Sequence, residues 1–73
     1  MQVDWQISAL EKKKYMESLS DELVTLRAKA GIPQDELSKL VGISRQTYGA
    51  IERGKKEMTW EVYMALLFFF ENS

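Results

Sequence analysis

Arg45 and Gln46 are neighbouring polar residues whose side chains can each form two hydrogen bonds to one partner. The arginine guanidinium can donate to O6 and N7 of guanine, and the glutamine amide can pair with N6 and N7 of adenine. Ser44 precedes the pair and Thr47 follows it. These residue types favour the recognition of base edges, provided that a rigid element presents them at its surface.

The first element that must position these residues is a short helix from Gln34 to Val41. Leu37, Leu40 and Val41 follow the spacing i, i+3, i+4, which predicts one apolar helix face. Gly42 comes next, and a residue in the left-handed region commonly ends a helix. The pattern therefore predicts a helix followed by a tight turn.

The second element is a predicted helix from Arg45 to Arg53. Ser44 is expected to cap it, because its hydroxyl can accept from a free backbone N–H. Gly54 should end it. The side chains expected to turn inward are Thr47, Tyr48 and Ile51. Two helices joined by a glycine turn within about twenty residues form a helix-turn-helix, whose second helix can enter a DNA major groove.

The segment L-x-x-x-x-G-I-S-R-Q-T from Leu37 and the segment I-E-R-G from Ile51 resemble the phage repressor and Cro-like helix-turn-helix family, also called the XRE family. The resemblance extends over roughly residues 19–70. The residues whose joint spacing carries it are Arg27, Gly31, Gln34, Leu37, Gly42, Ser44, Ile51, Glu52 and Gly54. It implies an all-α fold, a compact bundle of four helices with a fifth left open, and a sequence-specific DNA-binding transcriptional regulator.

The resemblance also implies which residues meet DNA. Residues 45–47 would read bases, Ser44 and Gln34 would hold phosphates at helix starts, and the basic residues after position 52 would flank the other strand. The expected DNA-contacting residues are Gln34, Ser44, Arg45, Gln46, Thr47, Tyr48, Gly49, Arg53, Lys55 and Lys56. Within the family, residues matching Arg27 and Glu52 form a structural ion pair, so the same pair is expected here.

Two positions in the second helix depart from the family pattern. Glycine inside a helix costs about 1 kcal/mol relative to alanine, so Gly49 requires a reason. Our hypothesis is that Gly49 lets the helix approach the bases closely and leaves base recognition to residues 45–47. Tyr48 occupies a usually aliphatic position, where it either joins the core with its hydroxyl at the rim or contacts a phosphate.

The chain is expected to divide into an N-terminal arm or short helix over residues 1–17 and a helix-turn-helix domain over residues 18–73. Val3, Trp5 and Ile7 alternate with polar residues, which fits either a strand or a loose arm with Trp5 on the core. Ser8 and Glu11 resemble a capping box, which predicts a short helix to about residue 17. Residues 12–14, all lysines, either contact phosphates or form a solvated face.

A new helix is expected to begin at Ser20, with Leu19 packed against Val24 as a hydrophobic staple. Its buried stripe should hold Leu23, Leu26 and Ala30, and Gly31 should end it. Thr59 is expected to cap a last helix that is apolar nearly all round. An apolar surface of this kind favours a homodimer on an inverted repeat, with an interface expected at Trp5, Leu66, Leu67, Phe69 and Phe70.

Composition limits the function classes. The 73 residues include no cysteine and no histidine, so disulfides, thiolate nucleophiles and the commonest metal ligands and general base are excluded. We therefore expect no enzyme, no cofactor and no metal site. The apolar run from Val62 to Phe70 is too short to span a bilayer, and no signal peptide is recognisable, so a cytoplasmic location is expected.

The formal net charge is −1, which by itself argues against nucleic acid. The stretch from Gly42 to Lys56, however, holds four basic residues and one acidic residue, a net charge of +3. Double-stranded DNA is therefore the expected partner, with a shallow salt dependence. The alternative left open is a protein-interaction module, such as an antitoxin-like domain that binds a protein partner.

Overall fold

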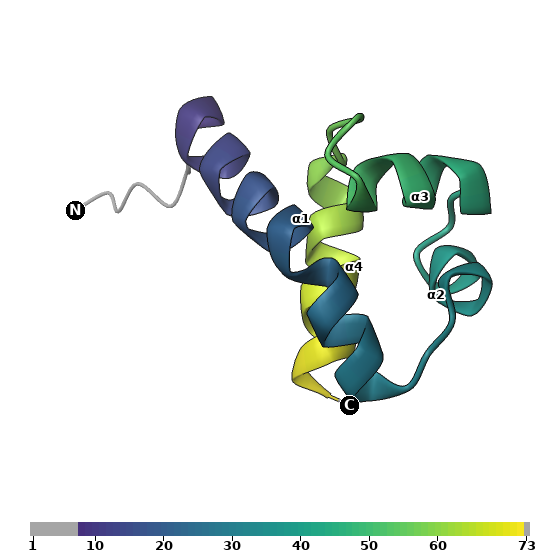
Figure 1. Cartoon of the computed structure of the whole chain (residues 1–73). Coiled ribbons are helices and arrows are strands. Elements are labelled where there is room, and N and C mark those ends of the chain that lie inside the picture. The colour runs from purple at the N-terminus through teal and green to yellow at the C-terminus, as the bar shows by residue number, and fades with distance from the viewer. Residues whose placement is uncertain (1–7, 73) are drawn as a thin grey trace.

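Residues 8–72 are the part of the chain that the computed structural model describes, and they form four helices and no strand. The helices are α1 (Ala9–Ala30), α2 (Gln34–Leu40), α3 (Arg45–Glu52) and α4 (Trp60–Glu71). In Figure 1, α1 and α4 cross side by side, and α2 and α3 lie to one side of them. The predicted all-α bundle of four helices is confirmed. The predicted strand at residues 3–7 lies outside the described residues.

The helix α1 is continuous, so the predicted new start at Ser20 is wrong. Ser8 caps α1 and forms a capping box with Glu11, with both hydrogen bonds at 3.1 Å. Ser20 lies in the middle of α1, and its hydroxyl donates to the backbone carbonyl of Ile51 on α3. The predicted staple is wrong as well, because Val24 is 55% exposed. Ser20 is therefore not a helix cap, and its hydroxyl links α1 to α3.

An aromatic contact explains why α1 extends so far before Ser20. The ring of Tyr15 stacks on Tyr63 of α4 at 6.5 Å between centroids, and Tyr63 stacks on Trp60 at 4.8 Å. Lys12 lies over the Trp60 ring at 5.1 Å, within the range of a cation–π interaction. Lys13 pairs with Glu57 at 3.5 Å, although both side chains are exposed and such a pair stabilises little. The first half of α1 is therefore attached to α4.

The other helix ends follow local sequence. Ser44 accepts from the backbone N–H of Thr47, and Thr59 accepts from that of Val62, as predicted for α3 and α4. Gly31 and Gly42 have φ values of 67° and 78°, which places both in the left-handed region where they end α1 and the turn after α2.

The core lies where α1, α3 and α4 meet, with α2 closing one side. Its buried hydrophobic members are Leu19, Leu23, Leu37, Tyr48, Ile51, Met58, Val62 and Leu66. Leu40 was expected on the inner face of α2, and this is wrong, because it is 61% exposed. The buried residues of α2 are Leu37 and Ser38, so the buried face is centred between them, and Leu40 lies on the far side of Leu37 from Ser38. Among the described residues, none of the helices has the length and apolarity needed to cross a membrane.

Candidate nucleic-acid interface

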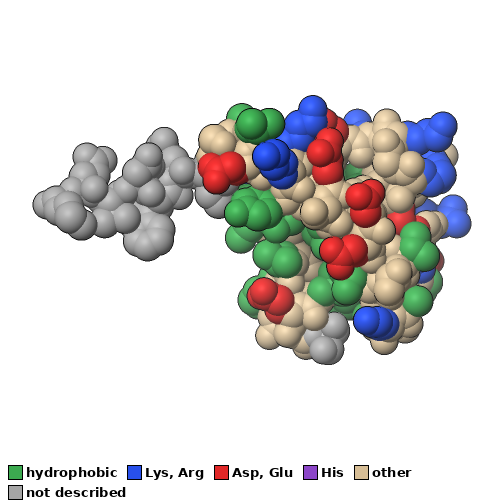
Figure 2. Space-filling model, turned by 60° about the vertical axis from the view of Figure 1, so that its left-hand side comes forward, with side chains coloured by type: hydrophobic (Ala, Val, Ile, Leu, Met, Phe, Trp, Pro, Cys, Tyr) green, Lys and Arg blue, Asp and Glu red, His purple; other side chains and the backbone are tan. Residues whose placement is uncertain are grey.

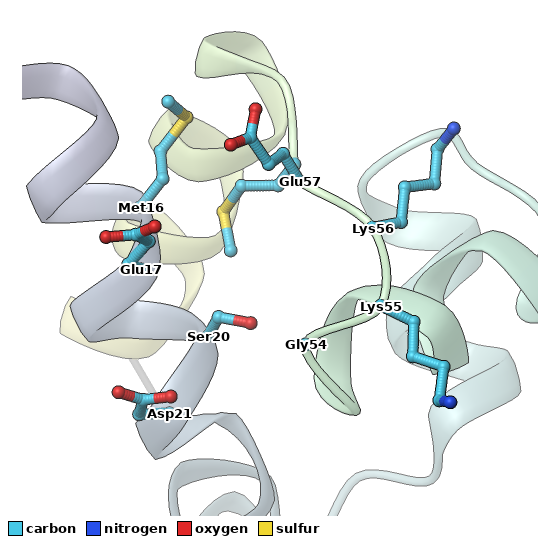
Figure 3. Close-up of a pocket in the computed structure, with 9 residues that line it drawn as sticks. Met16, Glu17, Ser20, Asp21, Gly54, Lys55, Lys56 and Glu57 are labelled. Atoms are coloured by element: carbon cyan, nitrogen blue, oxygen red, sulfur yellow. The ribbon is translucent and has the colours of Figure 1, made fainter. Parts of the chain in front are cut away.

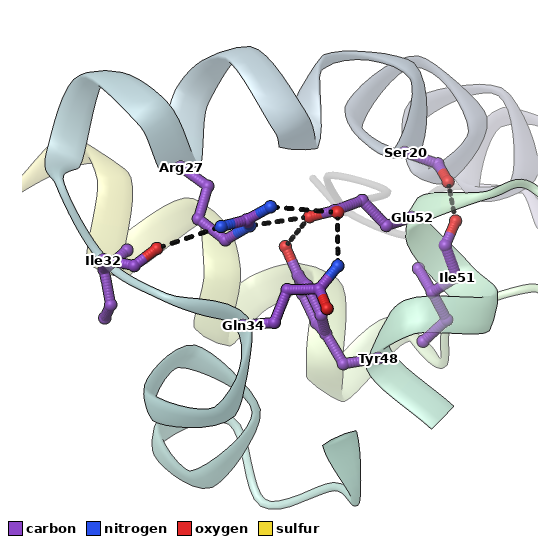
Figure 4. Close-up of polar contacts among 7 residues, drawn as sticks. All are labelled: Ser20, Arg27, Ile32, Gln34, Tyr48, Ile51 and Glu52. Carbon is purple, nitrogen blue, oxygen red and sulfur yellow. Dashed lines mark hydrogen bonds and ion pairs between the residues drawn. The ribbon is translucent and has the colours of Figure 1, made fainter. Parts of the chain in front are cut away.

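The carboxylate of Glu52 on α3 is the centre of a polar network (Figure 4). Arg27 of α1 donates to it through Nε at 2.9 Å and Nη2 at 3.2 Å. Gln34, the first residue of α2, donates through Nε2 at 2.7 Å, and the Tyr48 hydroxyl donates at 2.8 Å. Arg27 also donates to the carbonyl of Ile32 at 3.3 Å. One carboxylate therefore joins α1, α2 and α3.

The surroundings of this carboxylate favour its ionised form. The Glu52 side chain is only 5% exposed, and burial alone would raise its pKa. The hydrogen bonds from Arg27, Tyr48 and Gln34 outweigh burial and hold the pKa of Glu52 below its ordinary value. The pKa of Tyr48 is raised, first by burial of the phenol and then by its hydrogen bond to Glu52. The Glu52 bond raises the pKa of Arg27.

The network corrects one of the expected DNA contacts. Tyr48 is fully buried and uses its hydroxyl within the protein, so it joins the core and cannot contact a phosphate. Gln34 is partly exposed and one N–H of its amide donates to Glu52, which leaves the second N–H of the amide for a phosphate. The ion pair expected between Arg27 and Glu52 is present. Through their hydrogen bonds to Glu52, Arg27 and Gln34 attach the inner side of α3 to α1 and α2.

The opposite side of α3 is accessible. Gln46, Gly49, Ala50 and Arg53 have the spacing i, i+3, i+4, i+7, which places them on one stripe of the helix, in which Gly49 itself is buried. The Gln46 and Arg53 side chains are exposed, and so is that of Arg45 at the first position of the helix. Within residues 8–72, these three side chains form no hydrogen bond or ion pair with the protein. They are available to a partner.

Gly49 lies beneath the guanidinium of Arg53. A Cβ added at Gly49 would be 3.1 Å from Nη1 of Arg53 and 4.0 Å from its Cζ, and no other side chain lies within 4 Å. The backbone there is ordinary right-handed helix, since Gly49 is not among the glycines with positive φ. The core therefore does not require a glycine at this position. The only side chain that benefits from the missing methyl group is Arg53.

Lys55 and Lys56 continue the basic surface beyond the end of α3. They border an open hollow of about 400 Å³ between α1 and the loop that follows α3. Figure 3 shows that both lysine side chains point away from Glu17 and Asp21, which line the α1 side of the hollow. Both lysines are exposed, so they extend the positive surface outward without neutralising these acids.

The charges of the described surface are therefore unevenly distributed. Glu52 is bound inside the network, so every exposed charge between Ser44 and Lys56 is positive. Figure 2 shows several Lys and Arg side chains along the right-hand edge, and others at the top and the bottom of the visible face, where Asp and Glu side chains also lie. Such an arrangement suits a polyanion that approaches from the side of α3.

The surface of α4 differs from the expectation at one residue. Leu66 was expected at a dimer interface, and this is wrong, because it is fully buried against the core. Leu67, Phe69 and Phe70 are partly buried, and Trp5 lies outside the described residues. Phe68 is 70% exposed, and Met64, one turn earlier on the same face, is 48% exposed. The exposed apolar face of α4 is thus formed by Met64 and Phe68.

Sequence reasoning missed three roles in this region. The hydrogen bond from Gln34 to Glu52 had no sequence signal, since the two residues lie on different helices, whereas Tyr48 and Glu52 are four residues apart on α3 and that spacing does place them side by side. The hydroxyl of Ser20 was read as a cap because Asp21 and Glu22 follow it. The contact between Gly49 and Arg53 did carry a signal, because a glycine four residues before an arginine on one helix leaves room for the longer side chain.

Comparison with known proteins places this geometry in a family. A family model described as helix-turn-helix matches residues 23–62, a stretch that contains α2, α3 and most of the network. No curated protein and no solved structure matches the chain. The match covers more than half of the sequence and includes the turn between α2 and α3. The chain therefore belongs to the XRE family of helix-turn-helix proteins, which includes the phage repressors and Cro, and it is a DNA-binding regulator.

Proposed function

We propose that the protein is a transcriptional regulator that reads a specific DNA sequence by placing α3 in the major groove. Arg45 and Gln46 contact base edges, and Thr47 lies close enough to the same end of α3 to assist them. Lys55 and Lys56 contact phosphates. Ser44 can do so by turning its hydroxyl away from Thr47 Oγ1, to which it donates at 2.9 Å. The family is one of DNA-binding regulators, and its members are not typically enzymes.

The observation that carries this proposal is the contrast between the two sides of α3. On its inner side, Tyr48 and Ile51 are buried and Glu52 is held by four hydrogen bonds, so the helix is fixed in orientation. On its outer side, the side chains of Arg45, Gln46 and Arg53 have no partner within residues 8–72. A rigid helix with an uncommitted polar face can bind bases with little loss of conformational entropy.

We further propose that the protein binds as a homodimer to an inverted repeat. The exposed Phe68 and Met64 support a protein contact at α4, because an aromatic side chain with 70% exposure is unfavourable in water. A symmetric dimer would present two copies of α3 to two half-sites about 34 Å apart. The alternative of a pure protein-interaction module is not favoured, since the family match is to DNA-binding regulators.

The test is selection from a pool of randomised duplexes at low salt, followed by light scattering of the complex. We expect an enriched inverted repeat with half-sites about one helical turn apart, bound by two chains. Failure to enrich any sequence would contradict specific DNA recognition. Enrichment of a single half-site bound by one chain would contradict the dimer alone.

A further inference from the structure

We propose that Gly49 is a positioning residue for Arg53, and that Arg53 reads a base in the major groove instead of contacting a phosphate. The proposal rests on the DNA-binding function proposed above. It differs from the sequence-based expectation, in which Arg53 flanked the DNA backbone and Gly49 served only a close approach of the helix.

The first step is the direction of the Arg53 side chain. Arg53 follows the last residue of α3 with right-handed helical backbone, so its side chain leans back toward the N-terminal side of the helix. The guanidinium lies over Gly49, 3.1 Å from the place of a Cβ. Residues four apart on a helix are one turn, about 5.4 Å, apart along its axis. The positive group is therefore displaced by about one turn toward the N-terminal end of α3, which enters the groove.

The second step is the place that the guanidinium reaches. Gly49 and Ala50 lie between Gln46 and Arg53 on the outer stripe of α3, and neither has a side chain beyond Cβ. The middle of the stripe therefore carries no long side chain, and the guanidinium lies over Gly49, one turn from Gln46. Its planar donors match O6 and N7 of guanine. A G·C pair next to the base read by Gln46 is the ligand that this arrangement fits.

The third step is the exclusion of a packing role for Gly49. Only Arg53 lies within 4 Å of an added Cβ, so a methyl group there would meet no core atom. The contact at 3.1 Å is too short to keep, and the guanidinium is the flexible end of its side chain. In Gly49→Ala the guanidinium must therefore shift by a few tenths of an ångström, while the fold is retained.

The experiment is a double-mutant cycle on the duplex that the wild-type protein selects. Affinities of the wild type, Gly49→Ala, Arg53→Ala and the double variant are measured on that duplex and on duplexes with single base-pair changes. We expect Arg53→Ala to lose about 10-fold discrimination at one G·C pair, and Gly49→Ala to lose discrimination at the same pair. In the Arg53→Ala background, Gly49→Ala should have no further effect.

A phosphate contact gives a different pattern, for which Lys55→Ala is the control. Loss of a phosphate contact weakens binding to all sequences alike and lowers the salt slope by about 1. The same uniform weakening in Arg53→Ala would overturn the proposal, and so would full additivity of the two substitutions. If the wild-type protein selects no sequence, the proposed function fails, and this inference fails with it. Thermal melting of Gly49→Ala at or above the wild-type temperature shows that the variant is folded.

Discussion

At the scale of single residues, Glu52 determines how α3 is held. Its carboxylate accepts from three side chains on three helices, and the pairing with Arg27 is two-pronged. A carboxylate that is 5% exposed would be unfavourable without these donors. Removing one member therefore leaves the remaining groups buried and incompletely bonded, which costs more than the net value of a single hydrogen bond.

The network predicts a specific dependence of stability on pH. Because the folded-state pKa of Glu52 is lower than its ordinary value near 4.5, the ionised carboxylate stabilises the fold above that pH. This stabilisation is lost as the pH falls from about 4.5 through the lower folded-state pKa. Urea unfolding as a function of pH measures it.

The variant Glu52→Gln should lower the free energy of unfolding at pH 7 by about 2 kcal/mol, because charged hydrogen bonds are replaced by neutral ones. Its stability should also fall less steeply than that of the wild type below pH 4.5. Glu36→Gln, on the exposed side of α2, is the matched control, and its stability should fall below pH 4.5 as steeply as that of the wild type. An unchanged fall in stability below pH 4.5 in Glu52→Gln would show that Glu52 is not the group responsible.

At the scale of the helices, local chemistry determines where most helices end. Tertiary contacts determine which residues of a helix are buried or bonded to its neighbours. Ser44 and Thr59 could be predicted as caps because a cap needs only its own hydroxyl and the next turn. Ser20 could not be assigned from sequence, since its partner is a carbonyl 31 residues away. The exposure of Leu40 was missed for a related reason, because the spacing of apolar residues does not tell which of them the neighbouring helix covers.

The candidate site was predictable to a similar extent. The exposed positions of Arg45 and Gln46 follow from the cap and the helical period, both of which are local. The Arg27–Glu52 pair was expected from the family resemblance. The burial of Tyr48 and the use of Gln34 in the network depend on how α1, α2 and α3 converge, and no sequence pattern encodes that distance.

Substitution by alanine is expected to have opposite effects on stability at two glycines. Gly31 has φ of 67°, where a Cβ is strained, so Gly31→Ala should destabilise the fold by about 1 kcal/mol. Gly49 lies in right-handed helix beneath a flexible side chain, so Gly49→Ala should stabilise it by about 1 kcal/mol. Each change corresponds to a shift of about 4 °C or more in melting temperature for a domain of this size. Thermal unfolding of the two variants, compared in one buffer, measures both signs; destabilisation by Gly49→Ala would mean that Arg53 cannot move aside.

At the scale of the whole molecule, the basic surface proposed for DNA and the apolar face proposed for a second subunit lie on different helices. The basic surface is on α3 and in the loop after it, whereas the exposed Met64 and Phe68 are on α4. The aromatic stack between Tyr15, Tyr63 and Trp60 joins the long α1 to α4. DNA and a second subunit can therefore be contacted by different parts of one small bundle.

The dimer can be tested by one substitution on α4. Phe68→Glu places a charge on the exposed apolar face and should convert a dimer into a monomer in light scattering. Because Phe68 is 70% exposed, the free energy of unfolding of the monomer should change by no more than about 0.5 kcal/mol. Glu61→Gln, an exposed change elsewhere on α4, is the control. A Phe68→Glu protein with the wild-type mass in solution would place the interface elsewhere.

The central claim is that the outer side of α3 binds DNA, and Arg45→Glu tests it most directly. The measurement is a fluorescence anisotropy titration of the selected duplex with the wild type, Arg45→Glu and Lys29→Glu, the last making the same charge change on α1. We expect Arg45→Glu to weaken binding at least 10-fold, because a two-pronged base contact is lost, and Lys29→Glu to weaken it far less. Equal weakening by both variants, or unchanged affinity in a folded Arg45→Glu protein, would contradict the assignment of α3 as the recognition helix.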